Sequence, residues 1–177
     1  MPGWADLIES YGVSEATGTR LVRSLRTCEA AALAFCRLLD GWARVEPQPS
    51  TVGRRQAALR RAAERAETAL AGLEQPLDRY LLELESEIAE GQPWYGQPGP
   101  AELVEWEPVL RRAGVAVAPH RVAQAYLELA VLVRALEGLT TSVRFESRPD
   151  RASLWAGLFD LRENLFGAAD DLRALAA

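Results

Sequence analysis

Few residues in this chain belong to the types that carry most enzyme chemistry. The 177-residue sequence has one histidine, His120, and no lysine, since all 20 basic residues are arginine. It has no glycine-rich loop of the kind that cradles phosphates. His120 follows Pro119 at a predicted helix start, so we expect a capping or surface residue and not a base. Any chemistry would therefore have to come from carboxylates.

Two pairs of glutamates have a spacing that could hold a divalent cation. Glu64 and Glu67 lie three residues apart, as do Glu87 and Glu90, so each pair shares a helix face. The pattern resembles the paired acidic motif of all-α nucleotide pyrophosphohydrolases, which would imply Mg²⁺ held over a triphosphate. In that family the last acid is Asp and the two motifs lie on different helices. Here both pairs fall on one predicted helix, where Glu64 and Glu87 point about 140° apart. We therefore predict no catalytic, cofactor or metal site.

The two cysteines point to a reducing environment. Cys28 and Cys36 lie eight residues apart on one predicted helix, about 12 Å along its axis. That distance is too long for a disulfide within the chain, and a single histidine leaves no material for a Cys/His metal site. We expect reduced thiols in the core of a cytoplasmic protein.

Neither a targeting segment nor a membrane span is predicted. The start, MPGWADLIES, lacks the basic and apolar regions of a signal peptide. The most apolar stretch, residues 122–139, is interrupted by charged and polar side chains, so we expect a buried helix. The absence of lysine and the abundance of alanine are typical of the codon bias of a GC-rich bacterial genome.

One segment near the start has the form of a DNA-binding motif. Residues 6–22 resemble the helix-turn-helix of lac-repressor-type regulators, and the matching residues are Gly12, Val13, Ser14, Ala16, Thr17, Arg20 and Leu21. That resemblance implies major-groove contacts by Glu15, Thr17, Thr19 and Arg20. Two positions depart from the pattern. Ile8 stands where the family has a small residue, and Gly18 replaces an apolar one.

The charges are divided unevenly along the chain. Residues 20–65 carry ten arginines against four acids, whereas residues 66–107 carry ten acids against one arginine, and the net charge is −5. Folding the chain about a turn near residue 47 predicts ion pairs of Arg20 with Glu74, Arg26 with Glu67, Glu29 with Arg65, and Asp40 with Arg54 or Arg55. The stripe of Arg54, Arg61 and Arg65 stays on one face and is the best remaining anion site. The overall negative charge is unlike that of a typical DNA-binding protein.

Two signatures occur twice in the same order. WADLIESYGV (4–13) matches WEPVLRRAGV (106–115), and RVEPQPS (44–50) matches RFESRPD (144–150). The offset between copies drifts only from 102 to 100 residues, which predicts an internal duplication with a pseudo-two-fold axis, resembling a homodimer fused into one chain. The alternative is that similar helix ends need similar caps.

Composition and apolar spacing predict an all-α fold. The chain is 49% hydrophobic and rich in strong helix formers. We expect helices near residues 3–11, 15–44, 50–90, 101–113, 119–146 and 150–176. Apolar residues recur three and four apart in the four long segments, a spacing typical of helical bundles. We expect a first repeat over 1–90 and a second over 101–177, with one shared core.

The expected linker, GQPWYGQPGP over residues 91–100, contains three prolines and three glycines around two aromatic residues. Trp94 and Tyr95 are candidate contacts for a partner, as an exposed anchor. The alternative is that they pin the linker into the groove between the halves.

These features predict a non-catalytic helical-bundle protein that acts by macromolecular interaction. A protein partner or self-association is the first expectation, with no membrane, cofactor or small-molecule substrate. One alternative is a DNA-binding accessory or regulatory protein that uses the helix-turn-helix-like segment, with Arg54, Arg61 and Arg65 as further candidate contacts. A second is an Mg-dependent pyrophosphohydrolase-like enzyme.

Overall fold

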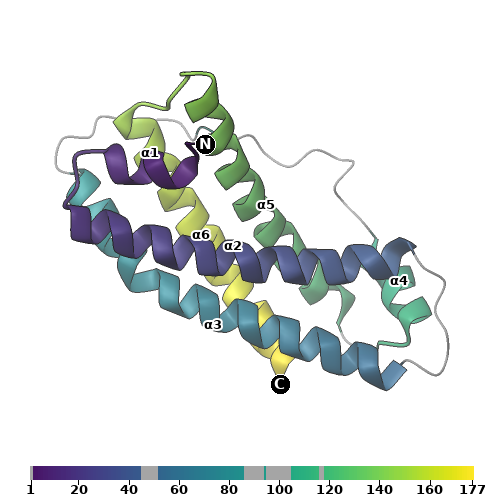
Figure 1. Ribbon diagram of the computed structural model, residues 1–177. Helices are drawn as coiled ribbons and strands as arrows, with labels where there is room; N and C mark the ends of the chain where they lie inside the picture. Colours follow the sequence, from purple (N-terminus) through teal and green to yellow (C-terminus); the bar gives the residue numbers. More distant parts are fainter. Residues whose placement is uncertain (1, 45–51, 86–93, 95–104, 116–117) are drawn as a thin grey trace.

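The computed structural model describes residues 2–44, 52–85, 94, 105–115 and 118–177. These residues form helices and no strand, which confirms the all-α fold class. The helices are α1 (Trp4–Ser10), α2 (Glu15–Arg44), α3 (Val52–Leu84), α4 (Trp106–Ala113), α5 (Pro119–Arg144) and α6 (Arg151–Ala176) (Figure 1). None of the helices in these ranges is long and apolar enough to cross a membrane.

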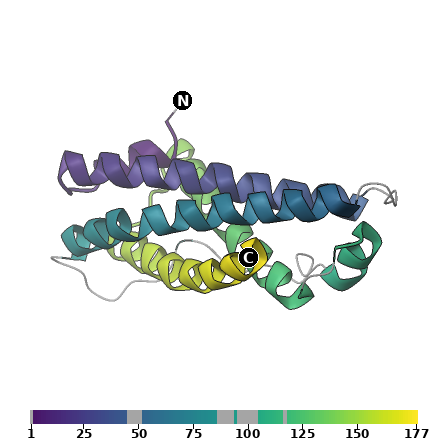
Figure 2. The same cartoon turned by 90° about the horizontal axis from the view of Figure 1, so that it is seen from below.

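The helices are arranged in two crossed layers. Helices α2 and α3 lie side by side and antiparallel, and α5 and α6 pass obliquely across them (Figures 1 and 2). Helix α3 packs on α6 and α2 packs on α5, so one face of the α2–α3 pair is turned to the core and the other to solvent. The short helices α1 and α4 each contact both α2 and α5, toward opposite ends of the bundle (Figure 1).

The apolar stripes predicted from sequence form the core. On α2, the residues Leu21, Leu25, Cys28, Ala32, Phe35 and Leu39 are all at most 1% exposed. The stripes expected on α3 and α6 are also buried along their whole length, and that on α5 is buried or half-buried. Burial of a large aliphatic or aromatic side chain contributes about 1.5–3 kcal/mol, so these stripes are the main source of stability.

Both cysteines are buried free thiols within this core, as predicted. Burial raises the pKa of Cys28 and of Cys36 to about 12, so both stay protonated and unreactive at neutral pH. The Cys28 thiol donates to the carbonyl oxygen of Ala69 at 3.1 Å, which requires α2 and α3 to lie close together there.

Truncating the core should cost far more than truncating an exposed leucine. Leu158 on α6 is 1% exposed, so Leu158→Ala should lower the free energy of unfolding by roughly 2–5 kcal/mol. Leu82 on α3 is 68% exposed, and Leu82→Ala should change it by less than about 0.5 kcal/mol. Urea unfolding followed by circular dichroism measures both, and equal losses would contradict the assignment of the core.

Candidate interaction sites

The turn between α1 and α2 is built around Ser14, the residue that caps α2. Its carbonyl accepts a hydrogen bond from the Gly18 amide at 3.0 Å, and its hydroxyl accepts one from the Thr17 amide at 3.4 Å. Serine is favoured at this position because its side chain satisfies an amide that the helix leaves unpaired. Gly12 in the same turn has φ of 43°, a left-handed conformation that favours glycine.

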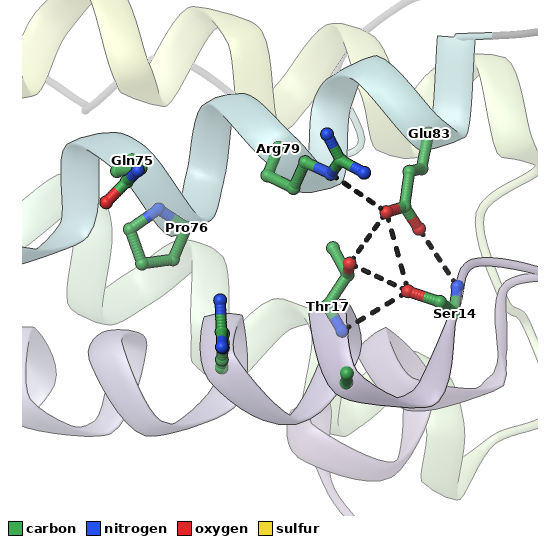
Figure 3. A pocket seen from close by; sticks show the side chains of 8 residues that line it. Ser14, Thr17, Gln75, Pro76, Arg79 and Glu83 are labelled. Carbon is green, nitrogen blue, oxygen red and sulfur yellow. Dashed lines mark hydrogen bonds and ion pairs between the residues drawn. The ribbon is translucent and has the colours of Figure 1, made fainter.

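A carboxylate from α3 occupies the N-terminus of α2. Glu83 accepts hydrogen bonds from the Ser14 amide at 3.0 Å, the Thr17 hydroxyl at 2.7 Å and the Arg79 guanidinium at 3.1 Å (Figure 3). These donors, the Ser14 amide above all, lower the pKa of Glu83 to about 2. A negative charge is also favourable at a helix N-terminus. Glu83 therefore remains ionised and ties the α1–α2 turn to α3.

The sequence alone did not identify Glu83. It lies 69 residues from Ser14, and its only local signal is the four-residue spacing from Arg79, typical of a helical ion pair. That spacing predicts a salt bridge within α3, but it gives no sign that Glu83 contacts α2.

The residues implied by the helix-turn-helix resemblance divide into two groups. Thr17 is 8% exposed, and its hydroxyl is already bonded to Glu83. Glu15, Thr19 and Arg20 are exposed on α2. Gly18 is buried beneath α1, where an added Cβ would make an ordinary van der Waals contact with the Glu9 Cα at 3.5 Å, so the site has room for alanine as well.

A cleft of about 490 Å³ lies beside this network, between the start of α2 and the second half of α3. Arg20 lines it from α2, and Gln75, Pro76 and Arg79 line it from α3 (Figure 3). The Ser14 and Thr17 hydroxyls here have no histidine beside them within the described chain. A carboxylate whose pKa is about 2 is a weak base at neutral pH, so Glu83 is poorly suited to activating either hydroxyl.

The ion pairs predicted within the α2–α3 hairpin do not form, which corrects the sequence interpretation. Glu67 pairs with Arg173 on α6 at 2.9 Å, and Asp40 accepts a hydrogen bond from the Tyr126 hydroxyl at 2.7 Å. The physical reason is the register of the hairpin. A turn near residue 47 would place residue 28 opposite residue 66, whereas Cys28 lies against Ala69.

The ten arginines of residues 20–65 consequently have no salt bridge to any acid within the part of the chain that is described. Nine of them are exposed, among them the predicted stripe of Arg54, Arg61 and Arg65. Arg55 is half-buried and approaches the Ala113 carbonyl oxygen at 3.4 Å. The predicted internal neutralisation of this basic region is therefore wrong.

Trp94 packs between α5 and α6. Its indole nitrogen donates to the Ala135 carbonyl oxygen at 3.3 Å, and its ring lies directly over Gly157, where a Cβ would come within 1.9 Å of the indole Cζ3. The half-buried ring rests against the core, but it lies between two helices of the second half and not in a groove between the halves. Tyr95 lies outside the described residues.

The glutamates considered for metal binding are not brought together in the described residues. Glu64 is exposed on α3, Glu67 pairs with Arg173, and Glu87 and Glu90 lie outside the described ranges. Within those ranges no group of three His, Cys, Asp or Glu side chains could hold a metal ion. His120 is exposed at the start of α5.

Replacing Glu83 should destabilise the protein in a pH-dependent manner. The folded-state pKa lies below the ordinary value of 4.5, so ionised Glu83 stabilises the fold above about pH 4.5, and this contribution is lost as the pH falls toward 2. Glu83→Gln should therefore have a lower urea midpoint of unfolding than the wild type at pH 7. The difference between the two midpoints should decrease as the pH falls from 4.5 to 2.5. Glu85→Gln, an exposed neighbour, is the control. A gap that does not change with pH would contradict the role of the charge.

The contact between Trp94 and Gly157 can be tested by a double-mutant cycle. Gly157→Ala should destabilise the wild type by about 1–3 kcal/mol, because the new methyl group displaces the indole. In a Trp94→Ala background the same change should stabilise α6 by about 0.5–1 kcal/mol, since alanine is the better helix former. Gly41→Ala, which adds a methyl group in open space, should be mildly stabilising in both backgrounds. Additive effects at residues 94 and 157 would contradict this packing.

Comparison of this chain with protein-family profiles, with curated proteins and with solved structures finds no match, so the assignment of a function depends on the geometry described above.

Proposed function

We propose that this protein is a non-catalytic helical-bundle protein that acts by binding another protein, and that the contact lies on the solvent-facing side of α2 and α3. The observation that carries the proposal is the cluster of arginines over residues 20–65, which have no salt bridge among the described residues. Like charges on two adjacent helices repel one another. An acidic partner surface relieves this repulsion and gains directional hydrogen bonds from the guanidinium groups.

The arrangement of helices supports the further proposal that the chain is a duplicated unit. Exchanging α1 with α4, α2 with α5 and α3 with α6 leaves the pattern of packed helix pairs unchanged. Gly12 and Gly114, which follow α1 and α4, both have positive φ, and the tryptophans that open these helices, Trp4 and Trp106, are both buried. Under this proposal the two halves began alike and later diverged, and the first acquired the larger cluster of exposed arginines without salt bridges among the described residues.

A second candidate function is DNA binding. Exposed Arg20 together with the stripe of Arg54, Arg61 and Arg65 favours it, because such side chains can contact phosphates. Two observations favour the protein partner. Thr17 is committed to Glu83, and the carboxylate at the N-terminus of α2 repels a phosphate at the place where the resemblance would put DNA.

Fluorescence anisotropy with two labelled polyanions separates these functions. The probes are poly-L-glutamate and a random-sequence DNA duplex, each at low and at physiological salt. We expect poly-L-glutamate to bind the wild type, and the triple variant Arg54→Ala/Arg61→Ala/Arg65→Ala to bind about tenfold more weakly, since three exposed charge pairs contribute roughly 0.5 kcal/mol each. The matched control removes three exposed arginines of the second half, Arg112, Arg144 and Arg148.

The two probes give different answers under the two candidates. Tight duplex binding, with a salt dependence that falls in Arg20→Ala, would place DNA binding first. Equal losses in the triple variant and its matched control would show that binding reflects overall charge and not this face. Failure of the wild type to bind either polyanion at low salt would overturn the proposed contact surface.

A further inference from the structure

A second hollow, larger than the cleft beside Glu83, runs along the outer side of α2 and α3. It is a groove of about 750 Å³. Its α2 wall includes Ala30, Ala31 and Ala34, and its α3 wall includes Ala69 and Gly72. The groove is the part of the basic face where the hairpin offers apolar surface to a partner.

Small side chains create this groove. Ala30 and Ala34 point to solvent on α2, and a Cβ added at Gly72 would meet no atom within 4 Å. The helices approach closely beneath the floor, where the Cys28 thiol reaches the Ala69 carbonyl oxygen. A furrow between two antiparallel helices has the width and direction to receive the side-chain ridge of a third helix.

The rim of the groove is mainly basic. Arg23 borders it on α2 and Arg65 on α3, with Glu64 as the acidic residue of the lining. Arg61, one helical turn before Arg65, extends the basic edge and is exposed. None of these three arginines has a salt bridge to a described residue. The occupant that fits is therefore apolar along its centre and acidic along its edges.

Charge also argues against a second copy of this chain as the occupant. A two-fold dimer through the groove would bring two copies of the same mainly basic surface together, so Arg23, Arg61 and Arg65 of one subunit would lie close to the arginines of the other. Such a pairing of like charges is unfavourable. An acidic partner has no such conflict.

We propose that the α2–α3 groove binds an amphipathic helix of a partner protein, with the apolar face of that helix on the alanine floor and its Asp and Glu side chains on Arg23, Arg61 and Arg65. This inference rests on the proposed protein-binding function and specifies the chemistry of the partner. Apolar residues spaced three and four apart on the partner helix enter the furrow. The arginines select acidic flanks and reject basic ones.

Three designed peptides of equal length test the inference by fluorescence anisotropy at physiological salt. The first is a helix with a leucine stripe flanked by glutamates, the second has lysines in place of the glutamates, and the third has the composition of the first in scrambled order. We expect the first to bind at least tenfold more tightly than the other two. Circular dichroism of the mixture should show increased helix content for the first peptide only.

Two groove variants and one control locate the contact. Ala34→Glu places an acid on the floor, and Gly72→Leu fills the furrow without changing charge at an exposed helical position with open space around it. Each variant should bind the first peptide at least tenfold more weakly than the wild type does. Ala174→Glu, at an exposed position of α6, should change its affinity less than twofold. Thermal melting of each variant confirms that it is folded.

The outcomes separate failure of the groove from failure of the proposed function. If the scrambled peptide binds as tightly as the striped one, or if both groove variants keep full affinity while folded, the proposed helix-binding site in the groove is overturned. The proposed basic contact surface is not affected by that result. If the striped peptide and poly-L-glutamate both fail to bind, the proposed function fails as well. Dimerisation of the protein alone, abolished by Ala34→Glu in sedimentation equilibrium, would overturn the assignment to a different partner.

Discussion

The register of α2 on α3 decides which side chains in this bundle meet and which remain free, and the Glu83 carboxylate fixes it at one end. The ionised Glu83 carboxylate accepts hydrogen bonds from the Ser14 amide, the Thr17 hydroxyl and the Arg79 guanidinium. Its negative charge also interacts favourably with the positive end of the α2 helix dipole. Farther along the hairpin, the Cys28 thiol donates to the Ala69 carbonyl oxygen. A slip by one residue would break both contacts, and the arginines of α2 would then face different residues of α3.

The arginines of residues 20–65 differ in their salt bridges from three arginines of α5 and α6. Arginines of the second half pair with acids on other helices: Arg121 with Asp171, Arg162 with Asp78 and Arg173 with Glu67. Two of those acids belong to α3, so these salt bridges join α6 to α3. The arginines of residues 20–65, in contrast, have no salt bridge to a described acid. Retained self-repulsion on one face is typical of a surface that meets an oppositely charged partner.

Local signals in the sequence predicted the helices well, since the forces that set them act over a few residues. Ser14 before Glu15 marks the start of α2, and Asp150 caps α6 by accepting a hydrogen bond from the Ser153 amide at 2.7 Å. The three-and-four spacing identified the buried stripes because burial on a helix depends on its period. Local signals could not predict the register of α2 on α3 or the position of Trp94 between α5 and α6. Both depend on the fit of surfaces distant in sequence, such as the bare backbone of Gly157 beneath an indole 63 residues away. The same limit affected the candidate site. The sequence identified the stripe of Arg54, Arg61 and Arg65, but the assumed register wrongly paired Glu29 with Arg65 and Asp40 with Arg54 or Arg55.

The two hollows along the α2–α3 hairpin differ in a way that bears on function. The cleft at the start of α2 has arginines and hydroxyls around it, but the protein's own carboxylate already satisfies its best donors. An incoming anion would have to displace an ionised group that accepts hydrogen bonds from the Ser14 amide and hydroxyl, the Thr17 hydroxyl and the Arg79 guanidinium. The groove at the middle of the hairpin has no such internal occupant, and its alanine floor gains from being covered. An anion that arrives with apolar surface beside it therefore binds better at the groove than at the cleft. Under the proposed function, this difference favours an amphipathic protein helix over a nucleotide or a bare phosphate as the ligand of the groove.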